Sequence, residues 1–151
     1  MKAGLLAAAL AVGATGVSAK TLTLECGELS GIRFSVDAHG KTQSGPNGFA
    51  ASHPTIVWPD EPRGAQATIS MSDASGVPES DPAITVHVTN ESVTWVVLQP
   101  KATEMWTYVA TNHMLIYSQQ SPRSGTDLSE TTPGSGASGD VMVTTCKEGL
   151  N

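Results

Sequence analysis

The sequence predicts an all-β fold: an antiparallel meander of about eight or nine short strands, forming a small barrel or sandwich stapled by one disulfide. Three observations predict it. Apolar and polar residues alternate with the period of two that is typical of half-buried strands. Residues that favour turns, chiefly Gly, Pro, Asn and Ser, separate these runs. Two cysteines lie near the ends of the alternating region, where a bond between them would join the first and last strands and remove exposed edges.

Residues 1–19 are predicted to be a secretory signal peptide. Lys2 supplies a positive start, an apolar run follows, and the small residues Val17, Ser18 and Ala19 form a cleavage site. The run is too short to be a membrane span, which needs roughly 20 apolar residues. We therefore expect a mature chain of residues 20–151, a single β-domain without a membrane span, in the periplasm or outside the cell.

Cys26 and Cys146 are predicted to form a disulfide. An even pair of cysteines in an oxidising compartment is typical of a structural bond. The alternative, a redox or metal-bound thiol, needs a neighbouring Cys or His, and neither cysteine has one nearby in the sequence. The bond would close a loop of about 120 residues, to which the chain-entropy model assigns about 5 kcal/mol.

The first predicted strands lie within residues 21–26, 31–37 and 65–72. The residues expected to share a buried face occupy alternate positions: Leu22, Leu24 and Cys26, then Ile32, Phe34 and Val36, then Ala65, Ala67, Ile69 and Met71.

The clearest hairpin covers residues 83–98, with its turn at 90–91. In the predicted register Val88 faces Val93, Val86 faces Trp95, and Ile84 faces Val97, so that all six side chains point to one side.

A second hairpin is expected from residue 103 to residue 119, with its turn at 111–113. There Tyr108 would oppose Ile116, and Val109 would oppose Leu115. The last strand is predicted over 140–146.

Two segments, near 38–53 and 120–140, are predicted to be flexible surface loops because turn formers dominate them. The second contains Gly134, Gly136 and Gly139, a formal match to the dinucleotide fingerprint G-x-G-x-x-G. That fingerprint requires a preceding strand and a following helix, and this sequence offers neither. No cofactor is expected.

Charge and motifs exclude several classes of function. The formal net charge is −6, and the few Lys and Arg residues are scattered, so we expect no nucleic-acid partner. No G-x-S-x-G or H-E-x-x-H motif occurs, so we assign no catalytic and no metal-binding residue. His39 and His53, both in the segment 38–53, remain an alternative metal or catalytic site.

Three aromatic residues are candidates for lining a ligand cavity: Trp95, Trp106 and Tyr108. In a small barrel the inward-facing side chains either enclose one small ligand or fill the core themselves. The sequence leaves both alternatives open.

The opening "TLTLEC", the segment "HMLIYSQQ" and the closing "VMVTTC" resemble small secreted or periplasmic β-proteins of Gram-negative bacteria that carry a terminal Cys pair. The resemblance implies a disulfide-closed β-domain and no particular activity. Periplasmic C-type lysozyme inhibitors, which are small β-barrels, share the terminal Cys pair. Their Ser-Gly-x-x-Tyr inhibitory loop is not found here, so that function is not carried over.

We expect a non-enzymatic binding module for a small apolar ligand or for a protein partner, because no catalytic motif accompanies the stapled β-fold. A protein partner would require an exposed apolar patch. Two alternatives stay open: an enzyme with a site in the segment 38–53, and a structural component of the cell envelope.

Overall fold

The computed structural model describes residues 21–36, 41–49, 52–59, 66–72, 77–100, 102–121 and 137–150. The predicted signal peptide lies outside these residues. Ten strands form within them: β1 Thr21–Cys26, β2 Leu29–Val36, β3 Thr42–Phe49, β4 Thr55–Pro59, β5 Gln66–Ser72, β6 Pro78–Val88, β7 Ser92–Gln99, β8 Ala102–Val109, β9 Met114–Ser121 and β10 Ser138–Leu150. In the same ranges the only helical element is the 3₁₀ turn Ala110–Asn112, and no helix there has the length and apolar character needed to cross a membrane.

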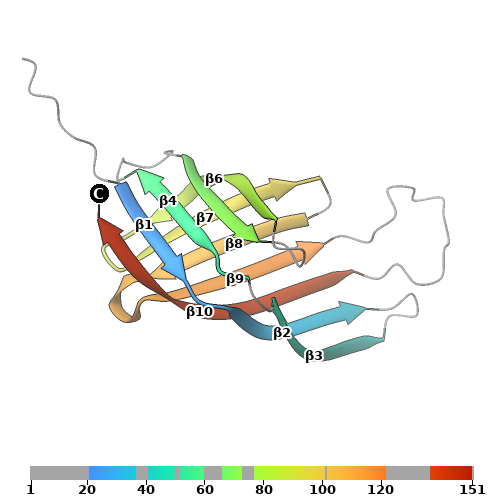
Figure 1. Ribbon diagram of the computed structural model, residues 1–151. Coiled ribbons are helices and arrows are strands. Elements are labelled where there is room, and N and C mark those ends of the chain that lie inside the picture. The colour runs from blue at the N-terminus through green and yellow to red at the C-terminus, as the bar shows by residue number, and fades with distance from the viewer. Residues whose placement is uncertain are drawn as a thin grey trace, which may run out of the picture.

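Eight strands close into an antiparallel barrel. Its order is β1-β4-β5-β6-β7-β8-β9-β10, and β10 pairs again with β1 (Figure 1). Cys26 lies directly opposite Cys146 in the β1–β10 ladder, and the two form a disulfide across a sequence separation of 120 residues. The predicted all-β fold, with one bond joining the first and last strands, is therefore confirmed.

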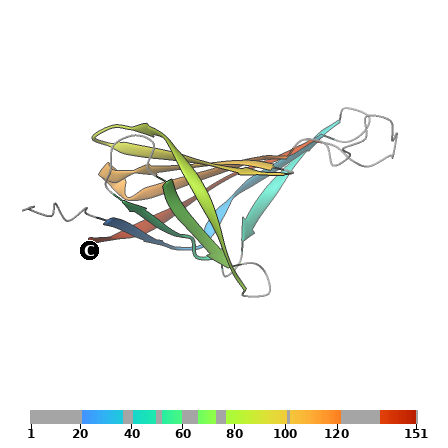
Figure 2. The ribbon, with the colours of Figure 1, turned by 90° about the horizontal axis from the view of Figure 1, so that it is seen from above.

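The hairpin of β2 and β3 lies outside this closed circuit. β10 is long enough to pair with two strands along one edge: Cys146–Leu150 pairs with β1, and Ser138–Val143 pairs with β2. β3 then adds to the far edge of β2. Figures 1 and 2 show the hairpin beside β10, extending away from the part of the barrel that the disulfide closes.

The prediction of a flexible loop at 38–53 is wrong for its central part. Thr42–Phe49 forms strand β3 and pairs with β2 over eight residues. A polar, Gly-rich segment can form an edge strand because backbone hydrogen bonds to its neighbour do not depend on apolar side chains. Of the predicted loop 120–140, residues 120–121 end β9 and 138–140 begin β10, while 122–136 lie outside the described residues.

The register predicted for the hairpin of β6 and β7 holds only next to the turn. Val88 does face Val93, but an irregularity between Thr85 and His87 then shifts the pairing. Trp95 faces Thr85 instead of Val86. Because one extra residue reverses the faces of a strand, Ile84 and Val86 point outward and are exposed.

The pairing predicted for one further hairpin and the buried face predicted for β2 are also wrong. In the hairpin of β8 and β9 the partners of Tyr108 and Val109 are Leu115 and Met114, because the 3₁₀ turn Ala110–Asn112 sets a register one residue from that predicted. On β2, Ile32 and Phe34 share a face as predicted, but that face is the outer one. The opposite face of β2 carries Arg33, which forms an ion pair with the buried Asp140 of β10.

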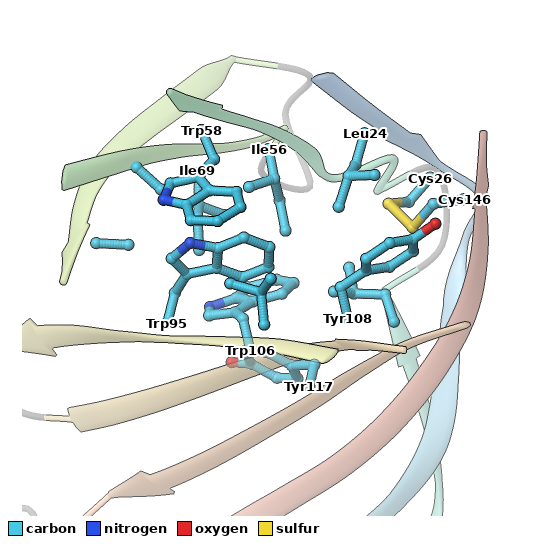
Figure 3. Packing of buried hydrophobic residues seen from close by; sticks show 14 of the residues in the cluster. Leu24, Cys26, Ile56, Trp58, Ile69, Trp95, Trp106, Tyr108, Tyr117 and Cys146 are labelled. Atoms are coloured by element: carbon cyan, nitrogen blue, oxygen red, sulfur yellow. A yellow bond between two sulfur atoms is a disulfide. The ribbon is translucent and has the colours of Figure 1, made fainter. Parts of the chain in front are cut away.

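The core is a group of aromatic rings that crosses the barrel. Trp58 and Trp95 meet edge to face with ring centroids 5.9 Å apart, and Trp106 and Tyr117 meet at 4.4 Å (Figure 3). Trp95 lies directly opposite Trp106 in the β7–β8 ladder. These side chains are buried together with Leu24, Ile56, Ile69, Leu115 and Met142. Such rings bury the largest apolar areas of any side chains, so this small barrel obtains most of its core from a few residues.

Candidate ligand-binding cavity

A cavity of about 580 Å³ is lined by residues of the barrel strands β5–β9 and of the hairpin of β2 and β3. Its apolar wall consists of Ile69, Met71, Val97 and Trp106. The rest of the lining is mostly polar and comes from β2, β3 and β5–β9. The volume falls in the range of roughly 300–1,000 Å³ that is typical of small-molecule sites.

Five polar side chains that line the cavity, together with Asp140, which binds one of them, form a set that we call the polar ring: Arg33, Asp81, Gln99, Glu104, Gln119 and Asp140. Its members are connected in pairs by hydrogen bonds or by ladder pairing. The Gln99 amide donates to Asp81 (3.3 Å), and the Gln119 amide donates to Glu104 (3.3 Å). Gln119 lies opposite Asp140 in the ladder, and Asp140 lies opposite Arg33.

Glu104 is the most deeply buried acid that lines the cavity, with 7% of its surface exposed. Three groups donate to its carboxylate: Trp106 Nε1 at 3.1 Å, Gln119 Nε2 at 3.3 Å and Tyr117 Oη at 3.5 Å. Burial raises the pKa of Glu104 above its ordinary value, and the three donors oppose that rise. Within the described ranges all of these donors are uncharged.

The carboxylate of Asp140, unlike that of Glu104, is paired with a positively charged group. Arg33 Nε donates to Asp140 Oδ1 at 2.9 Å, Arg33 Nη2 donates to Oδ2 at 3.3 Å, and Asn47 Nδ2 donates to Oδ1 at 2.8 Å. This two-point contact is the strong geometry for a guanidinium and a carboxylate. It raises the pKa of Arg33 further, and it joins β2, β3 and β10 beside the cavity.

The three tryptophans differ in how their indole N–H groups are used. Trp106 donates to Glu104, whereas the buried N–H groups of Trp58 and Trp95 have no hydrogen-bond partner among the described residues. An unpaired buried donor costs about 1–3 kcal/mol. Trp58 and Trp95 therefore serve packing alone, and Trp106 also orients the carboxylate.

Only one of the three candidate ligand-lining residues borders the cavity. Trp106 lines it, whereas Trp95 and Tyr108 are not among the lining residues and are buried in the core. Figure 3 shows Trp95 beside Trp106. The hydroxyl of Tyr108 donates to Glu148 and contacts His113 Nδ1 at 2.9 Å. Burial raises the pKa of Tyr108, with Glu148 adding to the effect, so the phenol stays protonated.

The described residues of the segment 38–53 do not form the alternative metal or catalytic site. His53 is exposed, and His39 lies outside the described residues. Among the residues described, no group of three His, Cys, Asp or Glu side chains could hold a metal ion.

The polar ring was missed by sequence reasoning, although a signal for it exists. In the two central strands, counting by twos along the inward face leads from aromatic residues to polar ones: Trp95, Val97, Gln99 in β7, and Tyr108, Trp106, Glu104 in β8. Such a series marks the point where a packed core gives way to a wetter interior.

In comparisons with known proteins, no protein-family model, curated protein or solved structure matches the chain.

Proposed function

We propose that the protein is an exported, non-enzymatic binding module that holds a small ligand inside its barrel. The observation that carries the proposal is the cavity, whose lining combines apolar and polar side chains. The disulfide between Cys26 and Cys146 supports export, since such bonds persist in oxidising compartments.

The lining favours an amphipathic ligand over a purely apolar one. An apolar molecule that filled the cavity would remove water from Glu104, Asp81 and Gln99 without replacing the lost hydrogen bonds, at a cost of about 1–3 kcal/mol per group. A ligand with one polar end and one apolar end could form hydrogen bonds with the polar side chains and pack against the apolar ones. Its apolar end would lie against Trp106 and Val97.

Narrowing the cavity tests this proposal. Val97→Phe adds volume at a buried lining residue, and Val57→Phe adds the same volume on the outer face of β4 as a matched control. Titration of the isotope-labelled protein with small amphipathic probes, followed by NMR, should shift resonances of cavity residues in the unaltered protein and in Val57→Phe, and not in Val97→Phe. If no probe shifts those resonances in the unaltered protein, the proposal is wrong.

A protein partner is a second candidate, favoured by a line of exposed apolar side chains on the outside. The ladders connect, strand by strand, a set that we call the outer row: Ile84, Val96, Met105, Ser118, Val141, Ile32 and Pro46. All but Ser118 are apolar, and Ile84, Met105, Val141 and Ile32 are exposed. Contiguous apolar surface of this kind is typical of interaction sites.

A photo-reactive amino acid at position 141 tests the outer row in cells, with the same probe at exposed Val57 as the control. A protein partner on the outer row gives a discrete cross-linked product at position 141 and none at 57. Equal products at both positions, or none at 141, would remove this candidate.

A further inference from the structure

We propose that the ligand carries a primary ammonium group, and that this group binds between Glu104 and Asp81 while an apolar portion lies against Trp106. The inference rests on the proposed binding of a ligand in the cavity and specifies the chemical class of that ligand.

The charge around the cavity favours a cation. Three carboxylates line it, those of Glu79, Asp81 and Glu104, against the single guanidinium of Arg33. Arg33 is already engaged by Asp140, which is 3% exposed. The cavity therefore presents an excess of negative charge, and its low-dielectric walls strengthen the attraction for a cation that replaces water.

The hydrogen bonds of Glu104 favour a cation that can donate. An ionised carboxylate offers about four acceptor positions, and three are filled by neutral donors. A buried carboxylate without a counter-charge is costly, and a charge-assisted N–H donor from the ligand would occupy the fourth position and supply that charge. Quaternary ammonium compounds lack this donor and are disfavoured.

A second carboxylate lies near the first. Asp81 lines the same cavity, accepts from Gln99 at 3.3 Å, and contributes to the raised pKa of Glu104 by like-charge repulsion. A cation between the two carboxylates relieves that repulsion. An ammonium group has three donors, which is enough to reach both acids.

The apolar part of the lining, which adjoins Glu104, decides the rest of the ligand. Ile69, Val97 and Trp106 form an apolar surface, and Trp106 packs against Tyr117 at 4.4 Å. An aromatic or aliphatic body placed there removes apolar surface from water. A compact, fully hydrated cation would gain nothing from this wall.

Three probes of nearly the same shape test the inference: phenethylamine, which is cationic at neutral pH, phenethyl alcohol, which is neutral, and phenylacetate, which is anionic. Dissociation constants are measured by NMR titration of the unaltered protein, of Glu104→Gln, and of Glu25→Gln as a control at an exposed acid on β1. Phenethylamine should bind about tenfold or more tightly than the alcohol, and phenylacetate most weakly. Glu104→Gln should remove the preference for the amine, and Glu25→Gln should preserve it.

The outcomes separate the two proposals. Equal affinity for the amine and the alcohol in the unaltered protein, with shifts at cavity residues, overturns the ammonium inference and leaves cavity binding intact. An amine preference that survives in folded Glu104→Gln also overturns it. If none of the three probes shifts the cavity resonances, the proposed binding function fails as well. The comparison of probes on the unaltered protein does not depend on whether the variant folds.

Discussion

Gly31 lies where β2 meets β10, and a single methyl group there should loosen the hairpin of β2 and β3. A Cβ atom at Gly31 would overlap the carbonyl oxygen of Val141 and would lie 2.6 Å from the Cα of Met142. Ordinary contact begins at 3.4 Å, so the backbones must separate by about 0.8 Å at Met142 and by more than that at the Val141 carbonyl. Overpacking against backbone costs about 1–3 kcal/mol, and each weakened ladder hydrogen bond adds about 1 kcal/mol. We expect Gly31→Ala to lower the free energy of unfolding by about 3 kcal/mol.

Urea unfolding followed by tryptophan fluorescence measures this loss. With a slope of about 1–3 kcal/mol per molar, the midpoint should fall by roughly 1–3 M. Gly45→Ala, on the adjacent strand β3, is the matched control because its added Cβ meets nothing within 4 Å. Its free energy of unfolding should change by less than about 0.5 kcal/mol. Equal midpoints for the two variants would refute the close approach of β2 and β10.

Three other predictions concern the disulfide, the buried acid and the ion pair. Replacing Cys26 and Cys146 by Ser should lower the free energy of unfolding by about 5 kcal/mol, measured by urea unfolding; a loss below about 1 kcal/mol would contradict the role of the bond in closing the barrel. Because burial raises the pKa of Glu104 in the folded state above its ordinary 4.5, stability should be greatest below that pH and should decline as pH rises through the folded-state pKa. Thermal unfolding across pH should show this decline in the unaltered protein and a weaker one in Glu104→Gln; identical profiles would contradict the assignment. Arg33→Met leaves Asp140 buried without its cation and should cost about 1–3 kcal/mol, of which Asp140→Asn in the same chain should recover part; no recovery would show that the pair is not coupled.

The all-β, disulfide-stapled fold could be predicted from the sequence, with barrel and sandwich left open, because alternation is a local signal and the cysteines are only two. Alternation placed Leu24, Ile69 and Trp95 on buried faces, and two cysteines near the chain ends required the terminal strands to meet. The failures have a different origin. The bulge between Thr85 and His87 reverses a face without any Gly or Pro to mark it, and β3 forms from polar residues because β2 offers it a free edge.

The cavity could be predicted only in part. Trp106 lines it as expected of an inward-facing aromatic residue. The polar ring, in contrast, consists of residues from different strands that come together only in the folded protein. Arg33 and Asp140 are separated by 107 positions in the sequence and meet only because β2 pairs with β10. Long-range pairings of this kind leave no signature in a local window of sequence. The alternation in β2 likewise does not reveal which face is buried, so the prediction that Ile32 and Phe34 point inward is wrong.

Native mass spectrometry of the protein, purified without denaturation from the cells that produce it, would detect a ligand bound in the cavity. We expect a mature chain, lighter by two hydrogens for the bond between Cys26 and Cys146, that carries a dissociable small-molecule adduct. The adduct should be absent from Val97→Phe and present in Val57→Phe. A bare chain for the unaltered protein, or an adduct that persists in Val97→Phe, would contradict the claim that this barrel holds a ligand.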